Sequence, residues 1–438
     1  MLAKIKSSIE KINELSKTKP IKLISHFDTD GITSAAIFSR ALRRWNKRFS
    51  LKIVKGLDEE FIKSLPEDNI LIFLDLASGS LNYLRDKKTE VFIFDHHEIA
   101  QTIPDNVTMI NPLLNNEEPI SGAAVCYLFA KALSPENRDL ANLAVVGMVG
   151  DMLEKNLGKV YDEILKDAEI TIRKGLLLYP STRPLDKALE YSSSFYIPGI
   201  TGSYRGVCEL LKEAEVPKVD GVFKPLYELT EEEMSRLITS VMLRMVDHKD
   251  HSELIGNLYL VKIFNKLEDA REFSALINAC SRMDHPEISL GFCLGNKKCI
   301  EEAERIYREY KQHLISALKY VSEIEKISGK KYTIINAKNN IKDTIIGTVT
   351  SIISHSPIYP EGTMIVALAY NEDKIKVSAR MSGKEGRNLR EILSRVVIPL
   401  GGEVGGHPNA AGCLISREKE SQFIQELQKV LELDTIKV

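Results

Sequence analysis

Short apolar runs alternate along the first part of the chain with segments whose apolar residues recur at helical spacing. The runs at 21–25, 69–74 and 90–94 are mostly apolar, as strands are when both faces of a parallel sheet are buried. The segment 140–150 is apolar on nearly every face, which indicates a buried helix. This alternation predicts an α/β domain with a parallel sheet over residues 1–185.

The region that follows, residues 186–330, favours helices. A Thr cap followed by three glutamates predicts a helix at 230–245. Apolar residues then keep helical spacing over 296–326, so we expect one long helix there that connects two domains. We interpret 186–330 as a helical insert with a connecting helix.

The last part, residues 331–438, again alternates strands with helices and predicts a second, smaller α/β domain. Its expected strands are at 331–337, 364–370 and 374–380.

The composition indicates a globular protein. The chain has 438 residues, of which 44% are hydrophobic and 27% charged, enough to bury the cores of two or three domains. No run of about 18 apolar residues is present, and Met1–Ser16 mixes Lys and Glu with apolar residues, unlike a signal peptide. We therefore expect a cytoplasmic protein.

The charge balance argues mildly against a nucleic-acid-binding protein, because 59 Lys and Arg face 61 Asp and Glu. One basic patch falls on the helix expected after the first strand, at Arg40, Arg43, Arg44 and Lys47. We interpret it as a solvated face with Trp45 packing inward rather than as a substrate contact.

Acidic and imidazole side chains follow four of the predicted elements. Each alone is typical of a helix cap or a surface turn. Together they fall where a parallel sheet places its chemistry, beyond the carboxyl ends of the strands. They are His26, Asp28 and Asp30 after the first strand, Asp75 after the second, Asp95, His96 and His97 after the third, and Asp151 after the apolar helix.

A mixture of Asp and His suits a hard-to-borderline divalent ion, Mn²⁺ before Mg²⁺, because imidazole ligation of magnesium is uncommon. The potential ligands exceed what one open catalytic site needs. Paired ions are the usual device for displacement at phosphorus, so we expect two.

These residues carry a family resemblance. The patterns His26-x-Asp28-x-Asp30-Gly31, Asp75, Asp95-His96-His97 and Gly147-x-x-Gly150-Asp151 resemble the four motifs of the DHH phosphoesterase superfamily. Near the other end, Gly405–Gly412 resembles the glycine-histidine signature of the DHHA1 domain, and Lys376–Arg380 and Asn388-Leu389 match the rest of its pattern. Between them, Ile277–Met283 resembles a segment of RecJ exonucleases, with Ser281 in place of the usual glycine.

The resemblance implies a DHH catalytic domain and a DHHA1 substrate-binding domain with the active site in the cleft between them. It implies a metal-dependent phosphodiesterase that acts as a single-strand-specific exonuclease on DNA and/or RNA by two-metal hydrolysis, with a lean to 5′→3′, in replication or repair. The expected ligands are His26, Asp28, Asp30, Asp75, His96 and Asp151, with Asp75 bridging the two ions.

Two further sets of residues are expected at the site. Asp95 and His97 are assigned behind the ligands, where a carboxylate–imidazole hydrogen bond fixes the tautomer, although His97 as a direct ligand stays open. Gly405 and Gly406 let backbone N–H groups approach a phosphate, and Arg282 is expected to clamp a terminal phosphate. The expected substrate-binding residues are Asn278, Arg282, Ser378, Arg380, Gly405, Gly406 and His407.

Other functions remain open. The wide gap between Asp151 and Asn278 resembles the archaeal RecJ group, or GINS-associated nuclease, whose helical insert contacts the replisome complex GINS. The same chemistry could serve an oligoribonuclease or a cyclic-dinucleotide phosphodiesterase. A non-enzymatic replisome scaffold subunit that binds GINS is the third possibility, and the intact Asp and His set argues against it.

Overall fold

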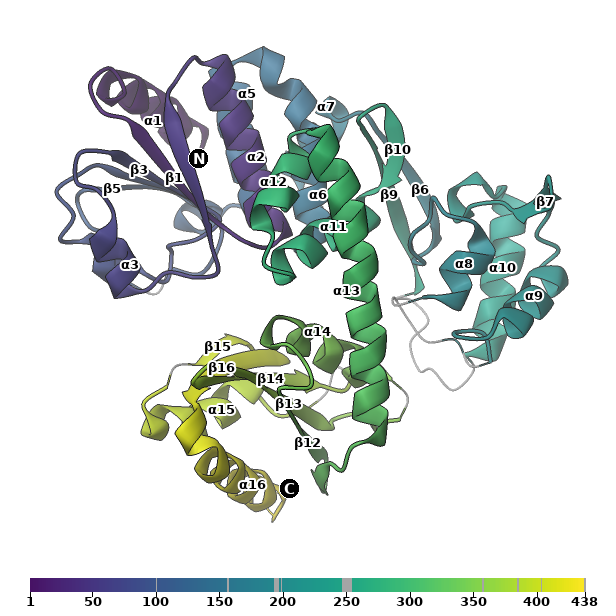
Figure 1. Ribbon diagram of the computed structural model, residues 1–438. Helices are drawn as coiled ribbons and strands as arrows, with labels where there is room; N and C mark the ends of the chain where they lie inside the picture. The colour runs from purple at the N-terminus through teal and green to yellow at the C-terminus, as the bar shows by residue number, and fades with distance from the viewer. Residues whose placement is uncertain are drawn as a thin grey trace. The chain divides into compact units, whose positions relative to one another are not determined.

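The computed structural model forms two compact units, Met1–Tyr307 and Arg308–Val438 (Figure 1). Helix α13 (Lys297–Glu323) begins in the first unit and ends in the second, in agreement with the long helix expected at 296–326. The structure describes residues 1–436 except for 100, 156, 193–196, 198, 246–253, 357, 384–385 and 403.

The first unit is built on a five-stranded, entirely parallel sheet with the strand order β2-β1-β3-β4-β5. Its three central strands lie at the apolar runs 21–25, 69–74 and 90–94, so the strands predicted there are confirmed. The outer strands differ: β2 is half-exposed with polar residues at alternate positions, and β5 contains Thr108, so neither is a continuous apolar run. The strands are β1 (Ile21–His26), β2 (Phe49–Val54), β3 (Ile70–Leu74), β4 (Val91–Phe94) and β5 (Val107–Ile110).

Helices cover both faces of this sheet (Figure 1). One face buries its aliphatic side chains against α1 (Leu2–Leu15), α2 (Thr29–Arg44), α5 (Gly122–Leu133) and α6 (Ala141–Gly150). The other face packs against α3 (Glu59–Ser64) and α4 (Leu81–Leu84).

The basic patch on α2 has the structural role expected of it. Arg44 forms a bidentate pair with Asp139, with both N–O distances at 2.7 Å, and Trp45 packs against the core of the parallel-sheet domain. The inward Trp45 and the exposure of Arg43 and Arg44 agree with the expectation, whereas Arg40 is partly buried and donates to Cys293 O at 3.5 Å.

The first unit also contains a second sheet, with the strand order β10-β9-β6. Strand β6 (Ile170–Leu176) pairs antiparallel with β9 (Ile255–Ile263). The domain boundary expected near 185 therefore assigns two paired strands to different parts of the chain. The region for which helices are expected therefore contains strands as well, since β7 and β8 also form a short hairpin. The remaining elements are β7 (Lys218–Val219), β8 (Val222–Phe223), β10 (Lys266–Asp269), α7 (Lys159–Asp167), α8 (Leu185–Glu190), α9 (Tyr204–Glu213), α10 (Glu231–Arg244), α11 (Ala270–Arg282) and α12 (Pro286–Cys293).

The second unit is a six-stranded mixed sheet with the order β11-β12-β13-β14-β16-β15. Its three expected strands correspond to β12, β13 and β14. Helix α14 packs on β13 and β14, and the other face buries a cluster shared with α15 and α16. The elements are β11 (Ile327–Gly329), β12 (Tyr332–Lys338), β13 (Met364–Asn371), β14 (Lys374–Met381), β15 (Val404–His407), β16 (Ala410–Ser416), α14 (Asp343–Ser354), α15 (Leu389–Val397) and α16 (Glu420–Ile436).

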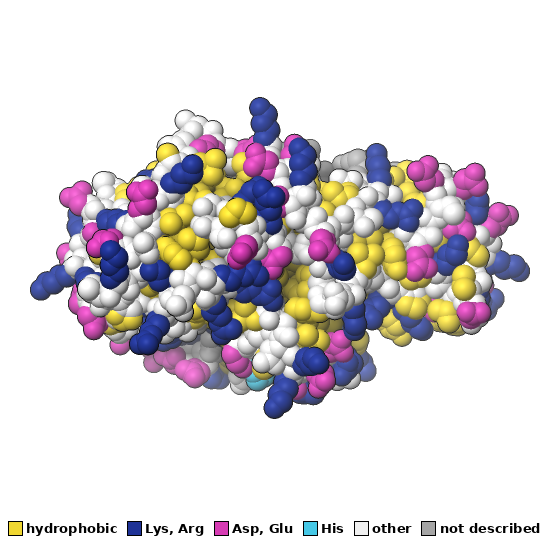
Figure 2. Space-filling view, turned by 90° about the horizontal axis from the view of Figure 1, so that it is seen from above, with side chains coloured by type: hydrophobic (Ala, Val, Ile, Leu, Met, Phe, Trp, Pro, Cys, Tyr) yellow, Lys and Arg dark blue, Asp and Glu magenta, His cyan; other side chains and the backbone are white. Residues whose placement is uncertain are grey.

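The surface agrees with the balanced composition. On the face drawn in Figure 2, basic and acidic side chains are interspersed. Among the helices in the described ranges, none is both long and apolar enough to cross a membrane.

Candidate metal centre

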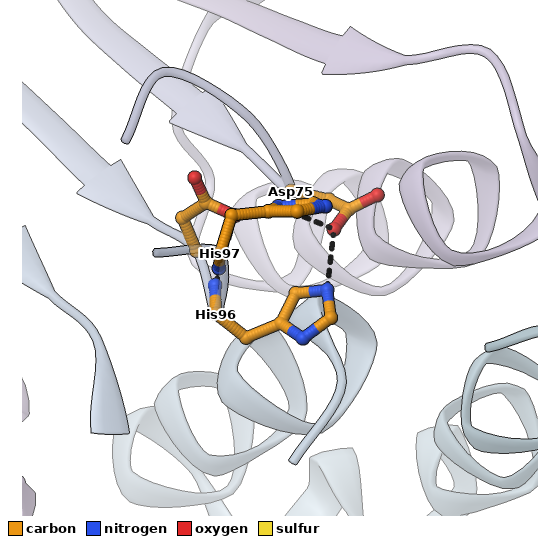
Figure 3. Close-up of side chains that lie close together, drawn as sticks. Asp75, His96 and His97 are labelled. Carbon is orange, nitrogen blue, oxygen red and sulfur yellow. Dashed lines mark hydrogen bonds and ion pairs between the residues drawn. The ribbon is translucent and has the colours of Figure 1, made fainter. Parts of the chain in front are cut away.

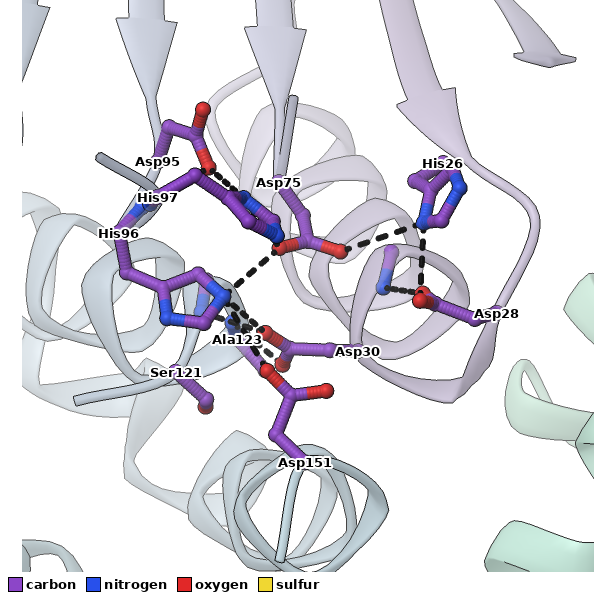
Figure 4. A network of polar contacts seen from close by, with 12 residues as sticks. His26, Asp28, Asp30, Asp75, Asp95, His96, His97, Ser121, Ala123 and Asp151 are labelled. Atoms are coloured by element: carbon purple, nitrogen blue, oxygen red, sulfur yellow. Dashed lines mark hydrogen bonds and ion pairs between the residues drawn. The ribbon is translucent and has the colours of Figure 1, made fainter. Parts of the chain in front are cut away.

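The carboxyl ends of three neighbouring strands and the ends of two helices bring eight Asp and His side chains together. Figure 4 shows how these side chains lie. Strands β1, β3 and β4 end at or just before His26, Asp75 and the Asp95–His97 triplet, while Asp151 follows α6. The structure thus brings together every site residue expected in the DHH domain. Three groups each hold ligand atoms within 4.8 Å of one another: Asp75, Asp95, His96 and His97; His26, Asp28 and Asp75; and Asp30, His96 and Asp151.

Asp75 lies between two imidazole rings, with one oxygen toward each. Its Oδ1 is 3.3 Å from His96 Nε2 (Figure 3), and its Oδ2 is 3.9 Å from His26 Nδ1. His96 Nε2 also lies 3.1 Å from Asp151 Oδ2, and His26 Nδ1 lies 2.9 Å from Asp28 Oδ2. Asp75 is therefore the side chain that joins two halves of the cluster, one at His26 and Asp28 and the other at His96 and Asp151.

The backbone at Asp75 adopts a conformation that is uncommon for non-glycine residues. Its φ of 59° falls in the left-handed region, and its side chain is 1% exposed. A non-glycine residue in this region costs free energy and is found where the surroundings hold it in place, often at functional sites. The fold thus accepts local strain to bury this carboxylate.

Asp30 is anchored by the N-terminus of α5. Its Oδ2 accepts a hydrogen bond from Gly122 N at 2.6 Å, and its Oδ1 accepts one from Ala123 N at 2.9 Å. Helix N-termini stabilise anions because their N–H groups have no partner within the helix. Ser121 caps the same helix by accepting from Ala124 N. This anchor was not predicted: Ser121 before an apolar run indicates where a helix begins, but it does not indicate which side chain that helix start contacts.

Two glycines make room for the carboxylates. A Cβ on Gly122 would lie 2.8 Å from Asp75 Oδ1, and a Cβ on Gly147 would lie 2.5 Å from Asp30 Oδ1. Such distances are shorter than any van der Waals contact, so a larger residue at either position would push the acid away.

Asp95 is fully buried and holds the loop that follows β4. It accepts hydrogen bonds from Ser78 N at 3.0 Å, His96 N at 2.8 Å and His97 Nδ1 at 2.7 Å. Burial raises the pKa of Asp95, but the His97 hydrogen bond and charge outweigh it and hold the pKa below its ordinary value. These contacts fit a residue that orients the two histidines.

The pKa values in the cluster show that its buried carboxylates favour nearby positive charge. Burial, and then the charges of Asp30 and Asp28, raise the pKa of Asp75 well above its ordinary value. Burial and the charge of Asp151 raise the pKa of Asp30 to about 7. Burial lowers the pKa of His96, yet the carboxylates of Asp151 and Asp75 raise it to about 12. Crowded buried carboxylates of this kind require protons or a cation.

The donor set fits a divalent metal. Three buried atoms have no hydrogen-bond partner among the described residues, although carboxylate or imidazole atoms lie beside them: His26 Nδ1, Asp75 Oδ1 and His96 Nε2. An unsatisfied buried polar atom is costly. One cation in the group of His26 and Asp75 and another in the group of His96 and Asp75 would satisfy these atoms. Carboxylate oxygens with imidazole nitrogens are ligands that Mn²⁺ and related ions accept.

The residues expected on the RecJ-like segment fall on α11. Asn278 Oδ1 accepts a hydrogen bond from Thr29 N at 3.1 Å, so this side chain holds the loop that carries Asp28. Thr29 Oγ1 also donates to Ser274 O at 3.0 Å. Arg282 lies in the last turn of the same helix, partly exposed.

Most of the expected residues of the second unit gather on one face of its sheet, whereas Gly406 pairs with Ala411 in the alternate row. Arg380 pairs with Ala410, and Ala410 pairs with His407, so the three lie in one row across β14, β16 and β15. Residues opposite one another in antiparallel strands project to the same face. Ser378 is two positions from Arg380 and accepts a hydrogen bond from its Nη1 at 3.2 Å. Gly405, Gly406 and His407 are exposed on β15.

Three protein-family models match separate parts of the chain. The DHH family, N-terminal domain, matches residues 20–148, and the DHHA1 domain matches residues 329–433. The DHH-CID domain matches residues 178–259, within the region between them.

Curated relatives match over different lengths. An uncharacterized protein of Methanocaldococcus jannaschii is 27% identical over 455 aligned positions, covering 98% of this chain and 99% of that protein. The single-stranded-DNA-specific exonuclease RecJ of Dickeya dadantii is 25% identical over 200 positions, covering 40% of this chain and 35% of that protein. The chain thus spans about a third of that exonuclease.

Solved structures share the fold. RecJ from Thermus thermophilus in complex with Mn²⁺ has a TM-score of 0.61 at 18% identity, covering 97% of this chain and 54% of that one. CDC45 from Entamoeba histolytica has a TM-score of 0.66 at 11% identity, covering 98% and 99%.

Proposed function

Since the chain is a RecJ-like protein of the DHH family, we propose that it is a metal-dependent phosphodiesterase that acts as an exonuclease on single-stranded DNA and/or RNA. The observation that carries the proposal is Asp75, a strained and buried carboxylate with one oxygen toward His26 and the other toward His96. The lean to 5′→3′ polarity rests on the RecJ resemblance alone.

The residues that would hold two divalent ions, Mn²⁺ in preference to Mg²⁺, are His26, Asp28, Asp30, Asp75, His96 and Asp151. When bound, such ions activate water and stabilise charge on the leaving oxygen in displacement at phosphorus. Asp75, which serves both halves of the cluster, is the residue that both ions would share. Asp30 stays in place through its two bonds to the N-terminus of α5.

His97 is suited to handle a proton. Its ring is 55% exposed, and the hydrogen bond from its Nδ1 to Asp95 raises its pKa. Asp95 thereby fixes the ring orientation and favours the protonated form, which can donate to a phosphate or leaving oxygen.

Phosphate contacts are assigned to the second unit. Arg380 is held by Ser351, since its Nε donates to Ser351 Oγ at 2.8 Å, and by Ser378. A fixed guanidinium suits the bidentate recognition of phosphate. Gly405, Gly406 and His407 continue the same face with exposed backbone and imidazole donors. Arg282 on α11 is proposed as the clamp for a terminal phosphate.

The test uses single strands labelled at either end, of DNA or of RNA, with Mn²⁺, Mg²⁺ or a chelator. We expect stepwise release of mononucleotides from one end only with metal, and little cleavage of duplex. Endonucleolytic products would refute the exonuclease, and undiminished cleavage in chelator would refute the metal requirement.

Hydrolysis assays on the same purified protein distinguish two alternative functions from the proposed one. An oligoribonuclease or cyclic-dinucleotide phosphodiesterase would lose activity as substrates lengthen from two to thirty nucleotides, whereas the proposed exonuclease would not. A replisome scaffold subunit would hydrolyse none of them. The overall fold shared with CDC45 is compatible with such a subunit, and the complete Asp and His set favours the enzyme.

A partner is also proposed for the insert. By resemblance to the archaeal group, a GINS-like replisome complex would dock on residues 186–275, which overlap the DHH-CID match and contain none of the metal-centre residues.

A further inference from the structure

Two apolar side chains border the metal centre without joining the cores that flank the parallel sheet. Phe27 stands between His26 and Asp28 and is partly exposed. Met152 directly follows Asp151 and is 70% exposed. Neither is among the described residues that form or pack against the hydrophobic clusters on the two faces of the sheet. Core packing therefore does not account for them.

The two side chains come from segments that touch. A Cβ on Gly150 would lie 2.8 Å from the Thr29 side chain, so the end of α6 packs against the start of α2. Phe27 and Met152 thus border the same cluster from adjoining segments.

Local geometry also sets these residues apart. The Phe27 ring meets the His26 ring edge to face, with centroids 5.0 Å apart. Met152 has a φ of 55°, the left-handed conformation in which helices commonly end, and its N–H donates to Val149 O at 3.2 Å at the end of α6. This helix ending fixes the backbone from which the Met152 side chain projects.

We propose that Phe27 and Met152 form the contact for the base of the nucleotide whose phosphate lies at the metal centre. This inference rests on the proposed function and adds a specificity element to it. Aromatic rings stack on bases of any sequence, and a methionine thioether is polarisable and adapts to flat apolar surfaces. The two side chains would favour substrates with a base at the reacting nucleotide and would not discriminate among bases.

The kinetic test compares single strands whose terminal nucleotide carries a base or is abasic, prepared for each end of the strand. The wild type is expected to prefer the strand with a base by about tenfold in kcat/KM, the size of a single base–aromatic stack. Phe27→Ala and Met152→Ala should bring this ratio close to one through KM, and Phe27→Tyr should restore it. Leu243→Ala, which truncates another exposed apolar side chain on α10, is the matched control and should keep the ratio. A wild type without the preference, or a ratio unchanged in both alanine variants, overturns the inference.

A binding test decides the inference independently of turnover. A single strand with terminal 2-aminopurine and a phosphorothioate at the terminal linkage is titrated with Mn²⁺ present, because stacking quenches this fluorophore. Quenching that Phe27→Ala and Met152→Ala weaken, and Leu243→Ala keeps, supports the stack. Quenching that is absent in the wild type, or undiminished in both alanine variants, overturns it. If no strand is hydrolysed under any metal, the proposed function fails while this titration still decides the stacking contact.

Discussion

The two units present their candidate functional groups in opposite ways. In the first unit, carboxylates such as Asp30, Asp75 and Asp95 are buried, and backbone N–H groups or glycine gaps fix their positions. In the second unit, Gly405 and His407 are exposed on the edge strand β15. A metal centre needs its ligands oriented before the ion arrives, whereas a phosphate can be met at a surface by exposed donors beside one fixed guanidinium, that of Arg380. The difference predicts which substitutions abolish the chemistry and which weaken substrate binding.

The largest effect is expected at Asp75. Asp75→Asn keeps the shape but removes the charge that faces both imidazoles, so kcat/KM should fall by about a hundredfold to a thousandfold. Steady-state kinetics on a labelled single strand measures it. Asp68→Asn, which neutralises an exposed acid before β3, is the matched control and should keep full activity. A folded Asp75→Asn protein with more than about a tenth of wild-type activity would contradict the two-metal assignment.

Two glycine substitutions test the claim that the carboxylates of the first unit cannot be displaced without loss of metal binding. Gly147→Ala places a Cβ 2.5 Å from Asp30 Oδ1, whereas Gly56→Ala meets nothing within 4 Å. We expect Gly147→Ala to weaken Mn²⁺ binding and to lower the free energy of unfolding by about 1–3 kcal/mol through overpacking. Gly56→Ala should change neither by much. Equal behaviour of the two variants in denaturant titration and metal binding would show that the close approach is unimportant.

Substitutions in the second unit should lower substrate affinity and leave metal binding unchanged. Arg380→Ala and His407→Ala should each raise KM by about tenfold, since a charge-assisted hydrogen bond contributes about 1.5–3 kcal/mol. Mn²⁺ binding should be unchanged in both. Loss of a metal equivalent in either variant would move that residue into the metal centre and would break the contrast between the units.

The smallest catalytic effect is expected in the insert. Glu231→Lys with Glu232→Lys reverses two exposed charges at the start of α10 and should leave hydrolysis within about twofold of the wild type, because exposed substitutions cost only about 0.5 kcal/mol. Glu233 is left intact, because it forms the capping box with Thr230 and lies 3.4 Å from Lys224. Pull-downs from the host measure the effect on a GINS-like complex. If the wild type recovers no replisome component, the partner proposal fails.

Much of the fold was predictable because it depends on local patterns. The central strands β1, β3 and β4 are continuous apolar runs, and each ends beside a metal-centre residue. Strand β2 was missed because an edge strand buries only alternate residues. Strand β9 was missed because its pairing with β6 joins residues about 80 to 90 positions apart, which no local period reveals.

The clustering of the candidate metal-centre residues was predictable from the sequence, whereas the contacts that hold them in place were not. Asp and His after successive strands could be read directly, because parallel strands share one carboxyl edge. The anchoring of Asp30 by Gly122 and Ala123 depends on where α5 begins in space, and short polar signals do not give that position. Asn278 was expected at the substrate, which stays a prediction; its oxygen also accepts a hydrogen bond from Thr29 N, a structural contact that the sequence did not indicate.

The central claim is that Asp75 joins two ion sites in one preorganised cluster. Isothermal titration of the chelator-treated protein with Mn²⁺ tests it most directly, with Asp75→Asn and Asp68→Asn titrated alongside. The account predicts two equivalents of Mn²⁺ per chain in the wild type and in Asp68→Asn, and the loss of at least one in Asp75→Asn. A wild-type protein that binds no Mn²⁺, or an Asp75→Asn protein that binds the same number of ions with the same affinity, would contradict it.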